Sequence, residues 1–189
     1  MNTRERLVDA ALGRFYRDGF RNVGIDQVLG DVGISKTAFY KHFESKDDLM
    51  LAVLEKQNLW LQELLREVTS QRPAGSPADL LHRLFDVGDQ IIASDDYQGC
   101  MFVNVAMEFP LAHEPAHCAA AAHKRAIEAI VTELAAQAGA DVPEKLAQEL
   151  CLIMEGAYVT RQVTGDPRTI EIARRVADAV IAARLPVAS

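Results

Sequence analysis

The chain has few of the features that mark secreted, membrane-bound or disulfide-stabilised proteins. It has only three cysteines, at Cys100, Cys118 and Cys151, and an odd number so widely spaced argues against a disulfide framework and fits a reducing compartment. The longest stretch without Asp, Glu, Lys or Arg, residues 97–107, is too short for the ~20 apolar residues of a membrane span. The polar residues 2–6 predict no signal peptide. We therefore expect a cytoplasmic protein.

Strand patterns, internal repeats and low-complexity segments are also absent. Hydrophobic residues make up 49% of the chain and charged residues 25%, which predicts a packed core. The apolar residues recur at helical spacing between capping residues, Gly and Pro. The pattern predicts an all-α protein in which three short helices precede a bundle of six longer ones. With their caps, the expected helices span residues 3–19, 25–32, 36–42, 45–70, 76–94, 98–109, 115–138, 143–164 and 166–184.

Positive charge is scarce except near the N-terminus. The net charge is -7, yet residues 1–46 contain 8 Lys and Arg against 6 Asp and Glu, while residues 47–189 contain 12 against 21. Only the N-terminal segment would therefore tolerate a polyanion. We expect a small domain over residues 1–46 that suits such a partner and a separate bundle over residues 47–189.

The second and third expected helices have the pattern of a helix-turn-helix. Gly33 follows the second helix, where a residue without Cβ turns the chain easily, and Ser35 is a candidate N-cap for the third. A small core is expected from Val28, Val32, Ile34 and Phe39. The opposite face of the third helix is then free.

Polar, aromatic and basic side chains occupy that free face and the residues after it. A helix of this kind fits the major groove, where its first residues meet base edges. Tyrosine and histidine can donate to phosphate oxygens, and lysine can neutralise them. The predicted DNA-binding residues are Lys36, Thr37, Tyr40, Lys41, His42 and Lys46.

The run ISKTAFYKHF, followed by SKDDL, resembles the signature of the TetR family of transcriptional repressors. Ala10, Ala11, Phe15, Gly19 and Phe20 resemble the same signature, which covers roughly residues 3–54. The resemblance implies about nine helices, with an N-terminal DNA-binding domain and a C-terminal domain for ligand binding and dimerisation. It also implies a homodimer that binds a near-palindromic operator and leaves this DNA when a small molecule binds. Carried over by position, Lys36, Thr37 and Tyr40 face the DNA and Lys46 holds a phosphate.

One position departs from the family pattern. The family often has Thr at the start of the second helix, where its hydroxyl meets a phosphate, and this chain has Gly24 there. The nearby Arg21 or Asn22 is a candidate replacement for that contact.

The sixth expected helix is apolar nearly all round except for Asn104 and Glu108, which lie four residues apart on one face. Because buried polar groups need partners, these two either bond to neighbouring helices or line a cavity for an apolar or aromatic effector. The second interpretation predicts an effector site made of Trp60, Phe85, Phe102, Asn104, Glu108, Met154 and Tyr158.

The last two expected helices are candidates for a dimer interface. The eighth has a strip of Ile153, Gly156, Ala157 and Thr160, and the ninth has a stripe of Ile170, Ala173, Val176, Ala177, Val180 and Ile181. The stripe is either core alone or part of a two-fold four-helix interface.

Two other classes of function stay open from the sequence. His113, Glu114 and His117 spell the H-E-x-x-H pattern of zinc hydrolases, but Pro115 predicts a helix that starts after His113, which separates the two histidines. A helical interaction module without DNA binding would also explain the acidic bundle. No catalysis, metal or cofactor is expected.

Overall fold

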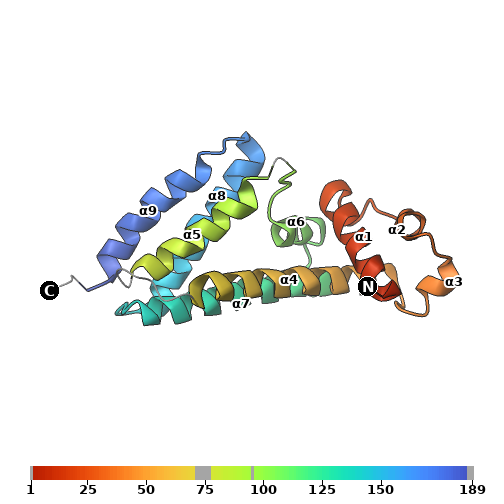
Figure 1. Ribbon diagram of the computed structural model, residues 1–189, viewed down its shortest axis with the longest axis horizontal. Helices are drawn as coiled ribbons and strands as arrows, with labels where there is room; N and C mark the ends of the chain where they lie inside the picture. Colours follow the sequence, from red (N-terminus) through yellow and green to blue (C-terminus); the bar gives the residue numbers. More distant parts are fainter. Residues whose placement is uncertain (1, 71–77, 95, 187–189) are drawn as a thin grey trace. The chain divides into compact units, whose positions relative to one another are not determined.

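The computed structural model describes residues 2–70, 78–94 and 96–186, and every regular element in these ranges is an α-helix, which confirms the all-α prediction. The predicted loop and helix start at residues 71–77 lie outside the described residues. None of the described helices has an apolar stretch long enough to cross a bilayer. The helices (Figure 1) are α1 (Thr3–Asp18), α2 (Ile25–Val32), α3 (Lys36–Phe39), α4 (Lys46–Ser70), α5 (Ala78–Ile92), α6 (Met101–Glu108), α7 (Pro115–Gln137), α8 (Pro143–Thr164) and α9 (Thr169–Arg184).

The turn between α2 and α3 has the predicted chemistry. Gly33 is left-handed, with φ 72° and ψ 41°, and its N–H donates to the Leu29 carbonyl at 2.8 Å. The Ser35 hydroxyl oxygen accepts from the Ala38 N–H at 3.2 Å, and Ser45 caps α4 in the same way through the Asp48 N–H. Gly33 therefore ends α2, and Ser35 and Ser45 cap the starts of α3 and α4, as predicted.

Several helix ends differ from the prediction. Asn2, rather than Thr3, caps α1, because it forms a reciprocal capping box with Glu5. The third helix ends at Phe39 instead of His42, since the His42 N–H turns back to the Phe39 carbonyl at 2.8 Å. Asp166 binds the Arg168 N–H in a turn before α9, which delays the helix start.

The chain packs as two compact units that do not follow its order. The first contains residues up to Leu59 together with Met101–His123, and the second contains the described parts of 60–100 and 124–189. The predicted boundary between residues 46 and 47 separates a DNA-binding domain from the rest of the chain by function. The two units described here are defined by how the chain packs. Helix α6 and the start of α7 therefore pack with the N-terminal helices.

Aromatic rings fill the core of the first unit. Phe15 and Phe20 stack with their centres 5.0 Å apart, and Phe39 lies 5.7 Å from Phe43. All four rings are almost fully buried, as are Val28 and Val32, while Ile34 is half-buried. This core holds α3 against α2 and the start of α4.

Helices α5, α8 and α9 pack together in the second unit (Figure 1). The α9 stripe divides between two environments: Ile170, Ala173, Ala177 and Ile181 are buried in the core of the unit, whereas Val176 is 48% exposed. Arg174 of α9 pairs with Asp86 of α5 at 2.8 Å. Most of the predicted interface stripe is therefore core.

Gly99 explains why α6 begins at Met101 rather than Gln98. Its φ of +90° is one that side-chain-bearing residues rarely adopt, and a Cβ there would lie 2.1 Å from Gln162 Oε1. The Gln162 amide in turn donates to the Gln98 carbonyl at 2.9 Å. The segment before α6 thus bonds to α8, and its left-handed backbone at residue 99 is what favours glycine.

We expect Gly99→Ala to lower the free energy of unfolding by more than about 1 kcal/mol, because alanine is strained at this positive φ, whereas the flexible end of Gln162 can move away from the new methyl group. The matched control is Gly13→Ala in the interior of α1, where nothing lies within 4 Å of a new Cβ. That change should stabilise the protein by about 0.5–1 kcal/mol. Urea unfolding of both variants measures the difference, and equal effects would contradict this account of residue 99.

Candidate nucleic-acid interface

Helix α3 buries one large side chain in the core and exposes polar side chains to solvent. Phe39 is fully buried, while Lys36, Thr37, Lys41 and His42 are exposed. Tyr40 is 57% exposed, and its ring meets the edge of Phe39 at 5.2 Å. An exposed aromatic ring set among basic and hydroxyl side chains suits a polar, negatively charged partner.

The lysine at the start of α3 is not an isolated charge. Lys36 Nζ lies 2.9 Å from the Asp26 carboxylate of α2, and this hydrogen bond raises the pKa of Lys36. Both side chains are largely exposed, so solvent screens the pair. The ion pair therefore holds Lys36 only weakly.

Lys46 at the start of α4 has a more defined position. Its ammonium donates to the Arg21 carbonyl at 3.2 Å and lies 5.9 Å from the centre of the Phe15 ring. Partial burial lowers the pKa of Lys46, which the nearby carboxylates of Asp47 and Glu108 oppose. One of its three N–H groups is thus used inside the protein, and two remain.

Gly24 caps α2 without a hydroxyl group. Its own N–H donates to Gln27 Oε1 at 2.8 Å, which closes the first turn of the helix. The proposed substitutes are both engaged elsewhere: Asn22 donates to the Asp18 carbonyl, and Arg21 Nε donates to the Glu108 carbonyl at 2.6 Å. The structure therefore gives no support to Arg21 or Asn22 as a replacement for the missing threonine.

The seven residues predicted to bind an effector divide between the two units. Trp60, Phe85, Met154 and Tyr158 belong to the second unit, where Phe85 is fully buried and Met154 and Tyr158 pack against the same core. Trp60 is 48% exposed. Phe102, Asn104 and Glu108 belong to the first unit.

Two of these three first-unit residues, Phe102 and Glu108, make contacts that indicate a structural role. The Phe102 ring stacks on His123 with centres 3.5 Å apart. The Glu108 carboxylate accepts from the Phe20 and Arg21 N–H groups at 3.0 and 2.7 Å. For Glu108 the structure thus matches the first interpretation, in which the polar residue bonds to its neighbours.

The contact between Arg21 and Glu108 was not predicted. The two residues lie 87 positions apart, so neither periodicity nor a local motif connects them. The sequence did indicate that Glu108 needs a hydrogen-bonding partner, because it is a carboxylate near the end of an apolar helix. It did not indicate which residue that partner is.

The H-E-x-x-H residues have other roles. Helix α7 begins at Pro115, as predicted, so His113 precedes it. Glu114 accepts from the Leu111 N–H at 3.0 Å, and His117 Nδ1 lies 2.8 Å from the Phe109 carbonyl. Within the described ranges no group of three or more His, Cys, Asp or Glu residues is arranged to hold a metal ion.

The described cysteines form no disulfide. Burial raises the pKa of Cys151 to about 12, so its thiol stays protonated and packs as a small apolar group. Cys118 is exposed, and its thiol donates to the Ala112 carbonyl at 3.3 Å.

Two family descriptions match the chain. "Bacterial regulatory proteins, tetR family" matches residues 7–53, which include the whole helix-turn-helix. "Tetracyclin repressor-like, C-terminal domain" matches residues 77–177, more than half of the chain.

Solved structures and curated relatives agree with these matches. A TetR-family transcriptional regulator from Streptomyces coelicolor is 27% identical, with a TM-score of 0.89 over 97% of this chain and 96% of that one. The reduced form of NemR from E. coli shares the fold, with a TM-score of 0.84 at 19% identity over 95% and 98% of the two chains. An uncharacterized HTH-type transcriptional regulator from Haemophilus influenzae is 35% identical over 74 residues, which are 39% of this chain and 36% of its own length. The chain thus matches only about a third of that relative's length.

Proposed function

This chain belongs to the TetR family of bacterial regulatory proteins, and we propose that it is a homodimeric repressor that leaves its operator when a small molecule binds. Membership makes it a DNA-binding transcriptional regulator with a helix-turn-helix, and not an enzyme. Its partners would be double-stranded operator DNA, a second copy and the effector. It would work in the cytoplasm, where the chromosome lies.

The observation that carries the DNA-binding proposal is the division of α3 into a buried and an exposed side. Phe39 anchors the helix, and the exposed Thr37 and Tyr40 are left for the major groove. Lys36 and Thr37 lie at the helix start and would reach base edges. Tyr40, Lys41, His42 and Lys46 would contact phosphates and set the position of the helix.

Thr37→Ala and Lys46→Ala should separate the two kinds of contact. Loss of a good base contact at Thr37 should cost roughly 1–3 kcal/mol on the operator and much less on random DNA. Loss of a phosphate contact at Lys46 should weaken all sequences alike and flatten the slope of log affinity against log salt by ~0.9 per half-site. Binding titrations at several salt concentrations, on operator and scrambled duplex, measure both effects.

Lys145→Ala is the matched control for Lys46→Ala, because Lys145 is an exposed lysine on α8 in the second unit. It should leave the salt slope unchanged. If Lys46→Ala alters sequence preference while Thr37→Ala alters only the slope, the assigned roles are reversed. If neither variant changes binding, the assignment of α3 to the groove is wrong.

The dimer proposal rests on two exposed apolar seams. On α8, Leu152, Gly156, Val159 and Val163 recur every three or four residues, with Leu152 73% and Val163 77% exposed. On α9, Ile172, Val176, Ala179 and Ala183 do the same. Exposed apolar side chains that line one face of a helix commonly mark an interface with another chain. The exposed seams, rather than the buried stripe, are the surface that we assign to the partner.

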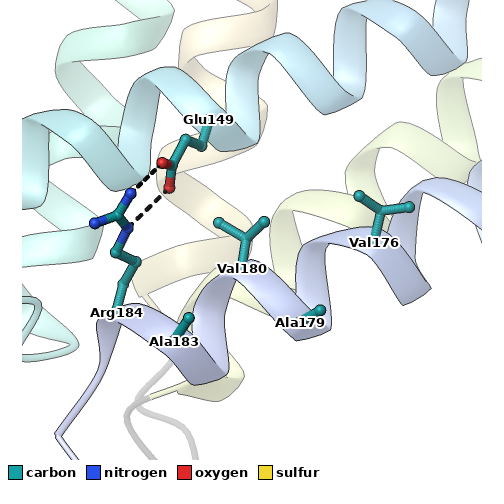
Figure 2. Close-up of a pocket in the computed structure, with 6 residues that line it drawn as sticks. All are labelled: Glu149, Val176, Ala179, Val180, Ala183 and Arg184. Atoms are coloured by element: carbon teal, nitrogen blue, oxygen red, sulfur yellow. Dashed lines mark hydrogen bonds and ion pairs between the residues drawn. The ribbon is translucent and has the colours of Figure 1, made fainter.

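An open groove runs along the α9 seam. Figure 2 shows Val176, Ala179, Val180 and Ala183 along the helix, with Arg184 bonded to Glu149 of α8 at one end. A second copy related by a two-fold axis would place its own α8 and α9 against this surface to form a four-helix interface.

Leu152→Asp combined with Val176→Asp should give monomers with weakened operator binding, because the carboxylates would be buried at the partner's apolar surface. Both side chains are exposed within one copy, so the fold should persist. Val142→Asp is the control, since Val142 is 43% exposed at the start of α8 but lies off the seam. Sedimentation or light scattering of each variant gives the mass, and a folded double variant that remains dimeric would place the interface elsewhere.

We assign the effector to the region of the second unit around Phe85, Met154 and Tyr158. These residues provide an apolar wall, and burial raises the pKa of Tyr158, so its hydroxyl stays protonated as a hydrogen-bond donor. An apolar or aromatic compound with one polar group suits that chemistry. The compound would lower DNA affinity by binding better to the released state.

Tyr158→Phe should weaken effector binding by about 1 kcal/mol, roughly fivefold, because it removes one hydrogen-bonding group without changing the ring. Operator affinity without the compound should stay the same. The measurement is a thermal-shift screen of small aromatic compounds on the native protein, followed by titration of the hits on the variant. Unchanged affinity for every hit would count against this position.

A further inference from the structure

The turn that joins α1 to α2 is held by a carboxylate from the end of α6. Glu108 Oε1 accepts from the Phe20 N–H at 3.0 Å, and Oε2 accepts from the Arg21 N–H at 2.7 Å. Hydrogen bonds to an ionised acceptor are about twice as strong as neutral ones. The chain also comes close here, since a Cβ on Gly19 would lie 3.4 Å from Glu108 Oε1. One side chain thus binds two consecutive backbone amides of the turn.

The Arg21 side chain in turn bonds to the backbone of Glu108. Its Nε donates to the Glu108 carbonyl at 2.6 Å, and its guanidinium carbon lies 4.6 Å from the centre of the Phe109 ring. A second nitrogen lies 3.6 Å from Glu114. The carbonyl of Glu108 has no partner further along its helix, because α6 ends at that residue. The helix end and the turn therefore satisfy each other's backbone groups.

A third residue connects this contact to the candidate DNA surface. The Arg21 carbonyl accepts from Lys46 Nζ at 3.2 Å. The Arg21 residue is thus held at its N–H by Glu108 and at its carbonyl by Lys46. Glu108 and Lys46 act on opposite ends of one residue, and all the groups involved belong to the first unit.

We propose that Glu108 is a positioning residue for DNA binding, which fixes the Arg21 carbonyl and through it the ammonium of Lys46. The proposal rests on the proposed phosphate contact of Lys46. An ammonium on a flexible stem loses rotational freedom when it binds a phosphate, and an anchor already present in the free protein reduces that loss. The Arg21 side chain supports the same arrangement, because it bonds to the Glu108 carbonyl.

The decisive variant is Glu108→Gln, because a carboxamide has one oxygen and turns an NH2 group toward the second backbone N–H. The matched control is Glu55→Gln, which removes the same charge from an exposed position on α4 in the same unit. Operator titrations at several salt concentrations give the slope of log affinity against log salt. We expect Glu108→Gln to flatten the slope by up to ~0.9 per half-site, as Lys46→Ala does, and Glu55→Gln to leave it unchanged.

Combining Glu108→Gln with Lys46→Ala distinguishes positioning from general stability. If Glu108 acts through Lys46, the double variant should have the slope of Lys46→Ala alone. Additive changes, or a Glu108→Gln slope equal to that of Glu55→Gln, would overturn the proposal while leaving the regulator's function intact. If Lys46→Ala itself leaves the slope unchanged, the proposed phosphate contact fails and the positioning role fails with it.

Amide hydrogen exchange of the free protein tests the contact without DNA. The Phe20 and Arg21 amides should exchange at least several-fold faster in Glu108→Gln and at the native rate in Glu55→Gln. Equal exchange in both variants would show that the carboxylate does not hold the turn and would overturn the proposal. Should Glu108→Gln fail to fold, Glu108→Asp keeps the charge and withdraws the carboxylate by one methylene. It should shift the slope and the exchange rates in the same direction, and native values for both would be equally decisive against the proposal.

Discussion

The burial of Phe39 is the constraint on which the DNA-binding surface depends. Helix α3 has only four residues, too few for a stable helix in isolation, so its conformation must come from packing. Phe39 is fully buried beside Phe43, and the Ser35 cap and the left-handed Gly33 determine where the helix starts. The exposed position of Thr37 follows from that one buried ring, because Phe39 fixes which side of so short a helix faces the core.

The same unit shows how distant polar groups complete a local motif. The turn after α1 has backbone N–H groups that no neighbouring residue satisfies, and Glu108 supplies the acceptor from the end of α6. Arg21 supplies a donor for the carbonyl at that helix end, and Lys46 binds Arg21 in turn. The helix-turn-helix is therefore supported from outside the residues that resemble the family signature.

In the second unit, α9 uses two faces for two purposes. Ile170, Ala173, Ala177 and Ile181 fill the core, while Ile172 and Val176 are exposed. A helix with apolar residues on more than one side needs more than one partner, and among the described helices α9 packs mainly against α5 and α8, which leave its second side exposed. This excess of apolar surface is the physical reason to expect a second copy against α8 and α9.

The sequence by itself determined the helical class, the helix-turn-helix and most helix positions, because these depend on local patterns such as Gly33, Ser35, Ser45 and Pro143. Periodicity also identified α9 as apolar, but it could not tell core from surface, since Val176 and Ala177 are both apolar and only packing decides which of them a neighbouring helix covers. Only the tertiary structure decided that Glu108 bonds to the α1–α2 turn, and that Arg21 is engaged there. Contacts across 87 positions depend on how helices meet in space, which neither capping nor spacing encodes.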